Sequence, residues 1–232
     1  MSTMTGMDVV VTGGAGALGT AVVRRFLAEG ARCIVPSIDD AEVERFALAK
    51  DEGVTMVRVN GLAKEDDVSK VYAHAKNLFA SIHVAGGFSM DPFVDTRLSD
   101  YEKLVTDNGT TVFLCAREAV RLMRSSGRGG RIVNVSAKPA LVPTGGLVAY
   151  AMSKAMVAAL TQSLAEEVKD DRIWVNAIVP STMDTAANRA AMPGAAFDAW
   201  PKVEEVAETI FFLGSPANRC TRGALVPVYG RS

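Results

Sequence analysis

The sequence has few of the side chains that build metal sites or disulfide frameworks. Only 2 of its 232 residues are histidines and only 3 are cysteines. His74 and His83 do not have the spacing of metal ligands, so we expect no metal. Cys33, Cys115 and Cys220 lie far apart in apolar surroundings. We expect them to be buried, reduced thiols of a cytoplasmic protein.

An excess of charge of one sign and long apolar runs are missing as well. The formal net charge is −1, so we expect neither nucleic acid nor an anionic membrane as a partner. The sequence shows no charged-then-apolar leader and no apolar run long enough to span a bilayer, so we expect no signal peptide and no membrane span. Hydrophobic residues make up 49% of the chain, enough for the core of one large domain.

What the sequence does have is an alternation of short apolar runs with helical patterns. The apolar runs lie at 9–11, 33–35, 54–59, 82–85, 132–135, 173–179 and 225–228. The helical patterns lie at 17–29, 40–52, 65–80, 99–125, 149–169 and 203–213. Continuous apolar strands alternating with helices predict a parallel sheet covered on both faces. We therefore predict an α/β protein with a doubly wound, seven-stranded, mostly parallel sheet (a Rossmann fold) in a single domain, 1–232.

One segment breaks the alternation. Residues 181–201 are rich in alanine, methionine and proline. Long connections inside compact domains are uncommon and often functional. We predict that this segment is a substrate lid.

A glycine-rich segment, TGGAGALG at 12–19, joins the first predicted strand to the first predicted helix. Glycines let backbone N–H groups approach a pyrophosphate, and the helix N-terminus adds further donors and the positive end of a dipole. The first strand-to-helix turn is where this mechanism places a dinucleotide. The segment therefore predicts binding of NAD(H) or NADP(H).

A tyrosine and a lysine, Tyr150 and Lys154, begin the helix predicted at 149–169. Residues four apart lie on one helix face. An ammonium about 6 Å from a phenol, at an effective dielectric of about 20, favours the phenolate by about 2.8 kcal/mol, or about two pKa units. The pair therefore predicts a general acid, Tyr150, whose pKa Lys154 lowers.

These motifs together resemble the short-chain dehydrogenase/reductase family along nearly the whole chain. The matching parts are residues 12–19, Asn108, the Tyr150–Lys154 pair and residues 175–185. The resemblance implies an NAD(P)-dependent oxidoreductase in which Asn108 bends its helix and anchors a proton-relay water. It also implies a homodimer or homotetramer that pairs through the helices at 99–125 and 149–169.

The resemblance further implies a set of cofactor-binding residues. They are Gly13, Ala15, Ala17, Leu18, Ser37, Asp39, Asn60, Gly61, Ala85, Gly86, Gly87, Tyr150, Lys154, Pro180, Thr182 and Thr185. Ala17 replaces the middle glycine of the family's loop. The acidic position at the end of the second strand falls on Ser37, with Asp39 and Asp40 just beyond it. Because neither the loop nor the 37–40 corner carries Arg or Lys, we expect a preference for NAD(H).

Two departures from the family pattern resemble one subgroup, the quinonoid dihydropteridine reductases. Ala137 stands where the family carries a serine, and the fourth strand ends in VAGGF rather than Asn-Asn-Ala-Gly. Thr144, Phe88 and the segment at 184–200 fit the same subgroup, although Asn108 and Ser37 depart from it. The implied substrate residues are Phe88, Ala137, Thr144, Asn188 and Trp200.

The missing serine has a chemical interpretation. A ketone gives an alkoxide that needs two hydroxyl donors, and losing one donor costs about 3 kcal/mol. A conjugated ring spreads the charge, so Tyr150 alone suffices as the acid. We therefore predict reduction of a small planar substrate, quinonoid dihydropterin in particular. The alternatives are an ordinary carbonyl reductase or alcohol dehydrogenase, in which Thr144 or Ser136 replaces the serine, and a cofactor-binding sensor without catalysis.

Overall fold

Seven parallel strands form the centre of the computed structural model, which describes residues 3–232. Their order across the sheet is β3-β2-β1-β4-β5-β6-β7, and every neighbouring pair is parallel. The strands are β1 (Asp8–Thr12), β2 (Arg32–Ser37), β3 (Val54–Arg58), β4 (Leu78–His83), β5 (Gly130–Val135), β6 (Ile173–Pro180) and β7 (Leu225–Val228). The order reverses between β1 and β4, so the predicted doubly wound fold is confirmed.

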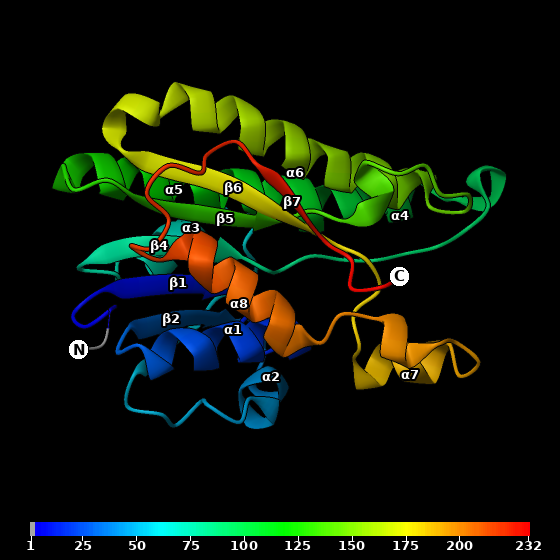
Figure 1. Cartoon of the computed structure of the whole chain (residues 1–232), viewed down its shortest axis with the longest axis horizontal. Coiled ribbons are helices and arrows are strands. Elements are labelled where there is room, and N and C mark those ends of the chain that lie inside the picture. Colours follow the sequence, from blue (N-terminus) through cyan, green and yellow to red (C-terminus); the bar gives the residue numbers. More distant parts are fainter. Residues whose placement is uncertain (1–2) are drawn as a thin grey trace.

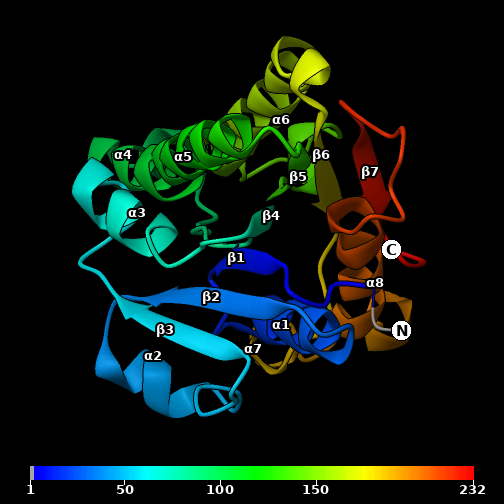
Figure 2. The same cartoon turned by 90° about the vertical axis from the view of Figure 1, so that its left-hand side faces the viewer.

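Helices cover both faces of the sheet (Figure 2). They are α1 (Ala17–Ala28), α2 (Asp40–Arg45), α3 (Glu65–Tyr72), α4 (Leu98–Leu104), α5 (Thr111–Ser126), α6 (Val148–Glu167), α7 (Ala186–Ala191) and α8 (Val203–Gly214). Alternate residues of one strand serve the two cores, because side chains alternate along a strand. Val9 and Val11 pack with α1 and α8, whereas Val10 packs with α3, α5 and α6.

The predicted ends of two helices, the predicted range of the fourth strand and the predicted burial of Cys220 are wrong. The helix expected at 40–52 ends at Arg45, because Phe46 turns into the core with extended backbone. The helix expected at 65–80 ends at Tyr72, and the fourth strand occupies Leu78–His83 rather than 82–85.

Cys33 and Cys115 are buried as expected, and burial raises the pKa of each thiol to about 12. Cys220 is exposed.

The carboxyl ends of the strands gather the segments that carry the predicted site. The loops that follow β1, β4, β5 and β6 all leave from this edge, which faces right in Figure 1, beside α7. The helix expected at 99–125 is divided, since a π-helical segment, Val105–Thr110, separates α4 from α5. Within residues 3–232, no helix is long and apolar enough to cross a membrane.

Candidate active site

Tyr150 and Lys154 lie in the first two turns of α6, against the end of β5. Lys154 is 5% exposed, and its Nζ donates a hydrogen bond to the carbonyl oxygen of Val135 at 3.0 Å. Burial lowers the pKa of Lys154 to about 8. Tyr150 is half-buried, and burial raises its pKa to about 12. The strand end therefore fixes the ammonium, while the phenol keeps its proton at neutral pH.

The pKa of Tyr150 corrects the expectation of a lowered value for this phenol, because burial raises it to about 12. Loss of hydration raises the pKa of a phenol and lowers the pKa of an amine. In this site the loss of hydration is the leading influence on both side chains. At pH 7 the pair is a neutral phenol and an ammonium, so Tyr150 has a hydroxyl proton to donate.

Phe88, one of the implied substrate residues, lies against Tyr150. Its ring packs edge-to-face on the ring of Tyr150, with centroids 5.0 Å apart and an angle of 74° between the planes. The Phe88 side chain is 66% exposed, so much of its surface is open to a ligand. An aromatic ring beside the acid is suited to contact a flat substrate.

The three residues at issue in the missing-serine question have different environments. Ala137 is buried. The Ser136 hydroxyl donates to the carbonyl oxygen of Lys154 at 2.9 Å and is buried there. Thr144 is exposed, and its hydroxyl donates to the carbonyl oxygen of Val142 at 3.1 Å. The Ser136 hydroxyl is thus committed to the backbone of α6.

Asn108 lies in the π-helical segment and is fully buried. Its Oδ1 accepts from the backbone N–H of Gly87 at 3.0 Å, and its Nδ2 donates to the carbonyl oxygen of Gly87 at 3.0 Å. The same Nδ2 donates to the hydroxyl of Ser153 at 2.9 Å. Sequence reasoning found Asn108 but missed Ser153, which has no signal beyond its place between Tyr150 and Lys154.

The glycine-rich loop has the shape that a pyrophosphate cradle needs. Gly13 has a φ of +65°, and a Cβ there would lie 2.7 Å from the backbone nitrogen of Ala85. A Cβ on Gly19 would lie 2.0 Å from the carbonyl oxygen of Gly13. Among residues 3–232, no side chain caps the start of α1 and no acid lies in its first turn. The free N–H groups of Ala17, Leu18 and Gly19 therefore suit an anion, and the loop fits a dinucleotide.

The corner at the end of β2 holds acidic groups and one cation that the sequence did not reveal. Ser37 is buried, and its hydroxyl donates to the carbonyl oxygen of Asp39 at 2.8 Å. The Asp39 carboxylate caps α2. Arg58, the last residue of β3, pairs in register with Ser37 and lies 3.7 Å from the carboxylate of Asp40. Strand pairing, which sequence spacing does not define, brings this guanidinium to the corner.

The remaining predicted cofactor residues lie along the same edge. The N–H of Ala85 donates to the Thr12 hydroxyl at 3.3 Å, which ties the ends of β1 and β4 together. The N–H of Asn60 donates to Asp67 at 3.2 Å, beside Gly61. Pro180 ends β6, and Thr182 follows it.

The segment predicted as a lid is held by contacts within itself and by hydrogen bonds to residues 229–232. Thr185 caps α7 by accepting from the N–H of Asn188 at 3.1 Å. The Asn188 amide donates to the carbonyl oxygen of Met183 at 2.8 Å. Trp200 packs on Phe197 with ring centroids 5.1 Å apart. The predicted residues Thr185, Asn188 and Trp200 thus share one segment, and their polar groups and rings have partners inside it.

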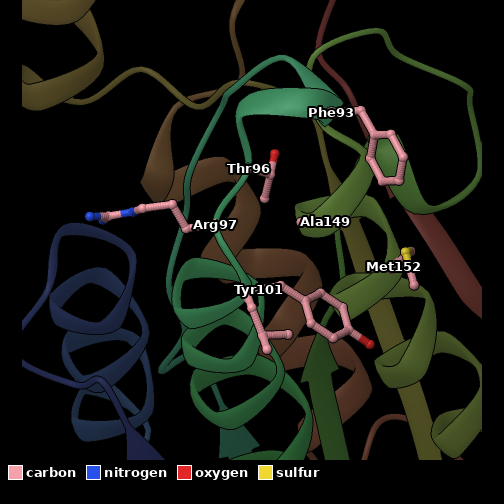
Figure 3. A pocket seen from close by; sticks show the side chains of 7 residues that line it. Phe93, Thr96, Arg97, Tyr101, Ala149 and Met152 are labelled. Carbon is pink, nitrogen blue, oxygen red and sulfur yellow. The ribbon is translucent and has the colours of Figure 1, made fainter.

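A cavity of about 260 Å³ lies between the segment at 93–101 and the start of α6 (Figure 3). Ala149 and Met152 line it from α6, and the ring of Tyr101 points toward Met152. A helix turns about 100° per residue, so Met152 lies about 160° around α6 from Tyr150. This cavity therefore opens on a different face of α6 from the acid.

Comparison with known proteins agrees with the fold. A family model described as short chain dehydrogenase matches residues 8–195. The uncharacterized oxidoreductase YuxG of Bacillus subtilis is 28% identical over 251 residues, which cover 95% of this chain and 36% of YuxG. This chain thus spans about a third of that protein.

Two further proteins match over most of their own length. The 3beta-hydroxysteroid dehydrogenase 2 of Eggerthella lenta is 31% identical over 193 residues, which cover 78% of this chain and 73% of that protein. A solved structure described as a short chain dehydrogenase/reductase family protein has a TM-score of 0.90 and 25% identity, over 99% of this chain and 98% of its own. The chain belongs to the short-chain dehydrogenase family, and it is an NAD(P)-dependent oxidoreductase.

Proposed function

We propose that this protein reduces a small planar substrate, with quinonoid dihydropterin as the first candidate. The observation that carries the proposal is the environment of Tyr150, a protonated phenol packed against the exposed ring of Phe88. Ala137 leaves the side chain at the family's serine position without a hydroxyl. One acid beside one aromatic ring suits a conjugated substrate better than a ketone, whose alkoxide needs two donors.

Tyr150, Lys154 and Phe88 have different roles in the proposed reduction. When bound, a nicotinamide cofactor would supply the hydride. Tyr150 gives its hydroxyl proton to the reduced substrate, and the Lys154 ammonium stabilises the phenolate that results. Lys154 is suited to this task because Val135 holds its Nζ at 3.0 Å. Phe88 orients a flat ring by contact with one of its faces.

The test is the loss of reduced cofactor after mixing with quinonoid dihydropterin. We expect turnover by the wild type and a loss of about 10²–10⁴-fold in kcat for Tyr150→Phe. Absence of turnover with both NADH and NADPH would refute the proposed substrate. Cofactor binding by both the wild type and Tyr150→Phe, without turnover by either, would instead favour the cofactor-binding sensor.

An ordinary carbonyl reductase or alcohol dehydrogenase is the second candidate. One relative, 31% identical over 193 residues, is named a 3beta-hydroxysteroid dehydrogenase. In this case Thr144 is the better substitute for the missing serine, because the Ser136 hydroxyl is buried on the backbone of Lys154. Activity on a panel of ketones and secondary alcohols that drops in Thr144→Ala, but not in Ser136→Ala, would favour this candidate over the planar substrate.

We keep NAD(H) as the proposed cofactor, on electrostatic grounds. Asp39, Asp40 and Glu42 surround the end of β2, where a 2′-phosphate would meet their repulsion. Arg58 offers one opposing charge, and Asp40 partly neutralises it. The measurement is KM for NADH and NADPH in the wild type and in Arg58→Ala. A preference for NADPH above about tenfold that disappears in Arg58→Ala would overturn the proposal.

The segment at 181–201 is proposed to act as a lid over the substrate. It begins at the end of β6, beside the site, and returns to α8. Its internal contacts include the two-bond pair between Arg189 and Asp184, and it is hydrogen-bonded to residues 229–232, so it would move together with the end of the chain. Protection of this segment from proteolysis by cofactor and substrate together would support the lid.

A second copy of this chain is the proposed protein partner, in a homodimer or homotetramer. Val148, Met152 and Met156 form an exposed apolar row on α6, with exposed fractions of 39%, 48% and 43%. Leu98 on α4 is 69% exposed and Phe113 on α5 is 52% exposed. Apolar surface of this extent favours association. The mass in solution, measured by light scattering for the wild type and Met156→Glu, tests this proposal.

We also propose a cytoplasmic location, because the three cysteines are expected to be reduced.

A further inference from the structure

One continuous chain of hydrogen bonds connects the end of β4 to the backbone of Tyr150. Gly87 is bound through both its N–H and its carbonyl oxygen by the Asn108 amide. Asn108 then donates to the hydroxyl of Ser153 at 2.9 Å, and Ser153 donates to the carbonyl oxygen of Tyr150 at 2.8 Å. Asn108 and Ser153 are both 0% exposed. These bonds join three elements that lie far apart in the sequence.

These hydrogen bonds use all the side-chain donors of Asn108 and Ser153. An amide has two N–H donors, and Asn108 gives one to Gly87 and one to Ser153. A serine hydroxyl has one donor, and Ser153 gives it to Tyr150. Removing the hydroxyl of Ser153 would therefore leave one buried N–H of Asn108 without a partner, which is costly.

The glycine turn is packed closely against the same groups. A Cβ on Gly86 would lie 2.3 Å from Oδ1 of Asn108 and 3.1 Å from Nζ of Lys154. A Cβ on Gly87 would lie 2.9 Å from a carboxylate oxygen of Asp107. The turn after β4, the π-helical segment and the first turns of α6 thus behave as one packed unit around Lys154.

We propose that Ser153 is a positioning residue, which sets the place of Tyr150 relative to the Gly86–Gly87 turn through Asn108. A serine that bonds its own helix three residues back is a local feature. Ser153 differs because it also accepts a hydrogen bond from Asn108, which lies in the π-helical segment and is bound to Gly87. The position of Tyr150 therefore depends on the position of the turn that follows β4. This inference rests on the proposed function, since it assigns Tyr150 the role of proton donor.

The physical reason for a large effect is the sensitivity of proton transfer to geometry. A displacement of about 1 Å in a reacting group costs about 10²-fold in rate. Without its hydroxyl, Ser153 would release Asn108 from α6, and the first turn of the helix would lose its connection to β4. The residues of the cofactor cradle at 12–19 form the end of β1, the loop and the start of α1, and none of them takes part in this chain of hydrogen bonds.

The chain offers a matched control on the same helix. Thr161 is also 0% exposed, its hydroxyl accepts from the amide of Asn134 at 2.8 Å, and it donates to the carbonyl oxygen of Val157 at 2.7 Å. The pattern of amide, hydroxyl and helix carbonyl is the one found at Ser153. Thr161 lies about 12 Å farther along α6 than Ser153, since a helix rises about 1.5 Å per residue.

The experiment compares Ser153→Ala, Ser153→Cys and Thr161→Val in the full chain, with quinonoid dihydropterin and 9,10-phenanthrenequinone as substrates. We expect kcat to fall at least about tenfold in Ser153→Ala, with KM for the cofactor within about twofold of wild type. Ser153→Cys, which keeps a weak donor, should restore part of the loss. Thr161→Val should lower the melting temperature but leave kcat unchanged. Equal kcat in Ser153→Ala and wild type, or an equal loss in Thr161→Val, would overturn the inference.

A second measurement does not depend on turnover. Hydrogen exchange should speed up at the amides of residues 84–88 and 148–152 in Ser153→Ala but not in Thr161→Val. If the wild type reduces neither substrate, the proposed function fails and the exchange pattern alone decides about Ser153. Unchanged exchange at 84–88 in Ser153→Ala would then reject the role assigned to it.

Discussion

At the scale of single residues, burial acts in opposite directions on the two ionisable groups of the site. It raises the pKa of Tyr150 to about 12 and lowers the pKa of Lys154 to about 8. In each case the charged form loses hydration. At neutral pH the phenol is protonated and the amine is charged, which is the pair of states that reduction of a substrate needs.

The pH dependence of reduction follows from these two values. We expect kcat/KM to fall as the pH rises through about 8, because Lys154 then loses the charge that stabilises the phenolate. The Tyr150 phenol stays protonated throughout this range. The measurement is kcat/KM between about pH 6 and about pH 10, with Lys154→Met as the control. A fall at the same pH in Lys154→Met would assign the titration to another group.

The sequence identified residues by type and spacing but not by the direction of their side chains. Tyr150, Lys154 and Phe88 come together because spacing along a helix and position after a strand determine their place. The Ser136 hydroxyl is buried on the backbone of Lys154 because of the way β5 packs against α6. Ser153 and Arg58 are brought to the site by contacts between elements. Tertiary contacts of this kind leave no periodic signal in a sequence.

At the scale of elements, strand and helix starts were easier to predict than helix ends. The glycine loop and the start of α1 follow from local chemistry, so both were found. The end of α2 is set by the burial of Phe46, which is 3% exposed and has extended backbone. Propensity would continue this helix further, but the burial of Phe46 in the core stops it.

The glycine loop gives a prediction that separates the two glycines at its helix end. In Gly19→Ala the new Cβ would lie 2.0 Å from the carbonyl oxygen of Gly13, so the loop must deform. In Gly16→Ala the nearest atom, the same oxygen, lies at 3.4 Å, an ordinary contact. We expect Gly19→Ala to weaken NADH binding more than about tenfold and Gly16→Ala to change it less than about threefold. Fluorescence titration with NADH measures both, and equal affinities in the two variants would contradict this account.

At the scale of the whole molecule, a buried polar network crosses the core between α3 and α6. His83 on β4 lies 2.8 Å from the hydroxyl of Ser81 and 2.7 Å from Oδ1 of Asn134. The Asn134 amide donates to Thr161, so its Oδ1 accepts from Nδ1–H of a neutral His83. Tyr72 joins the network through Ser81 at 2.6 Å. The network links four elements, and it contains one group that titrates near neutral pH in an unfolded chain.

Acid should therefore destabilise the folded protein through His83. Burial lowers the pKa of His83 to about 4, below its ordinary value of 6.5. Above pH 6.5 the imidazole is neutral in both the folded and the unfolded chain, so it does not change the free energy of unfolding. As the pH falls from 6.5 to 4 the unfolded chain takes up the proton first, so the folded state loses about 3 kcal/mol.

The measurement is the free energy of unfolding in urea at about pH 7 and about pH 4. Between these two pH values the wild type should lose about 3 kcal/mol more than His83→Asn, which keeps a polar group but cannot take up the proton. His74→Asn removes an exposed histidine and should follow the wild type. Parallel losses in the wild type and His83→Asn would mean that carboxylates alone cause the acid sensitivity. A larger loss in both the wild type and His74→Asn than in His83→Asn would assign the acid sensitivity to the imidazole of His83, at the centre of the sheet.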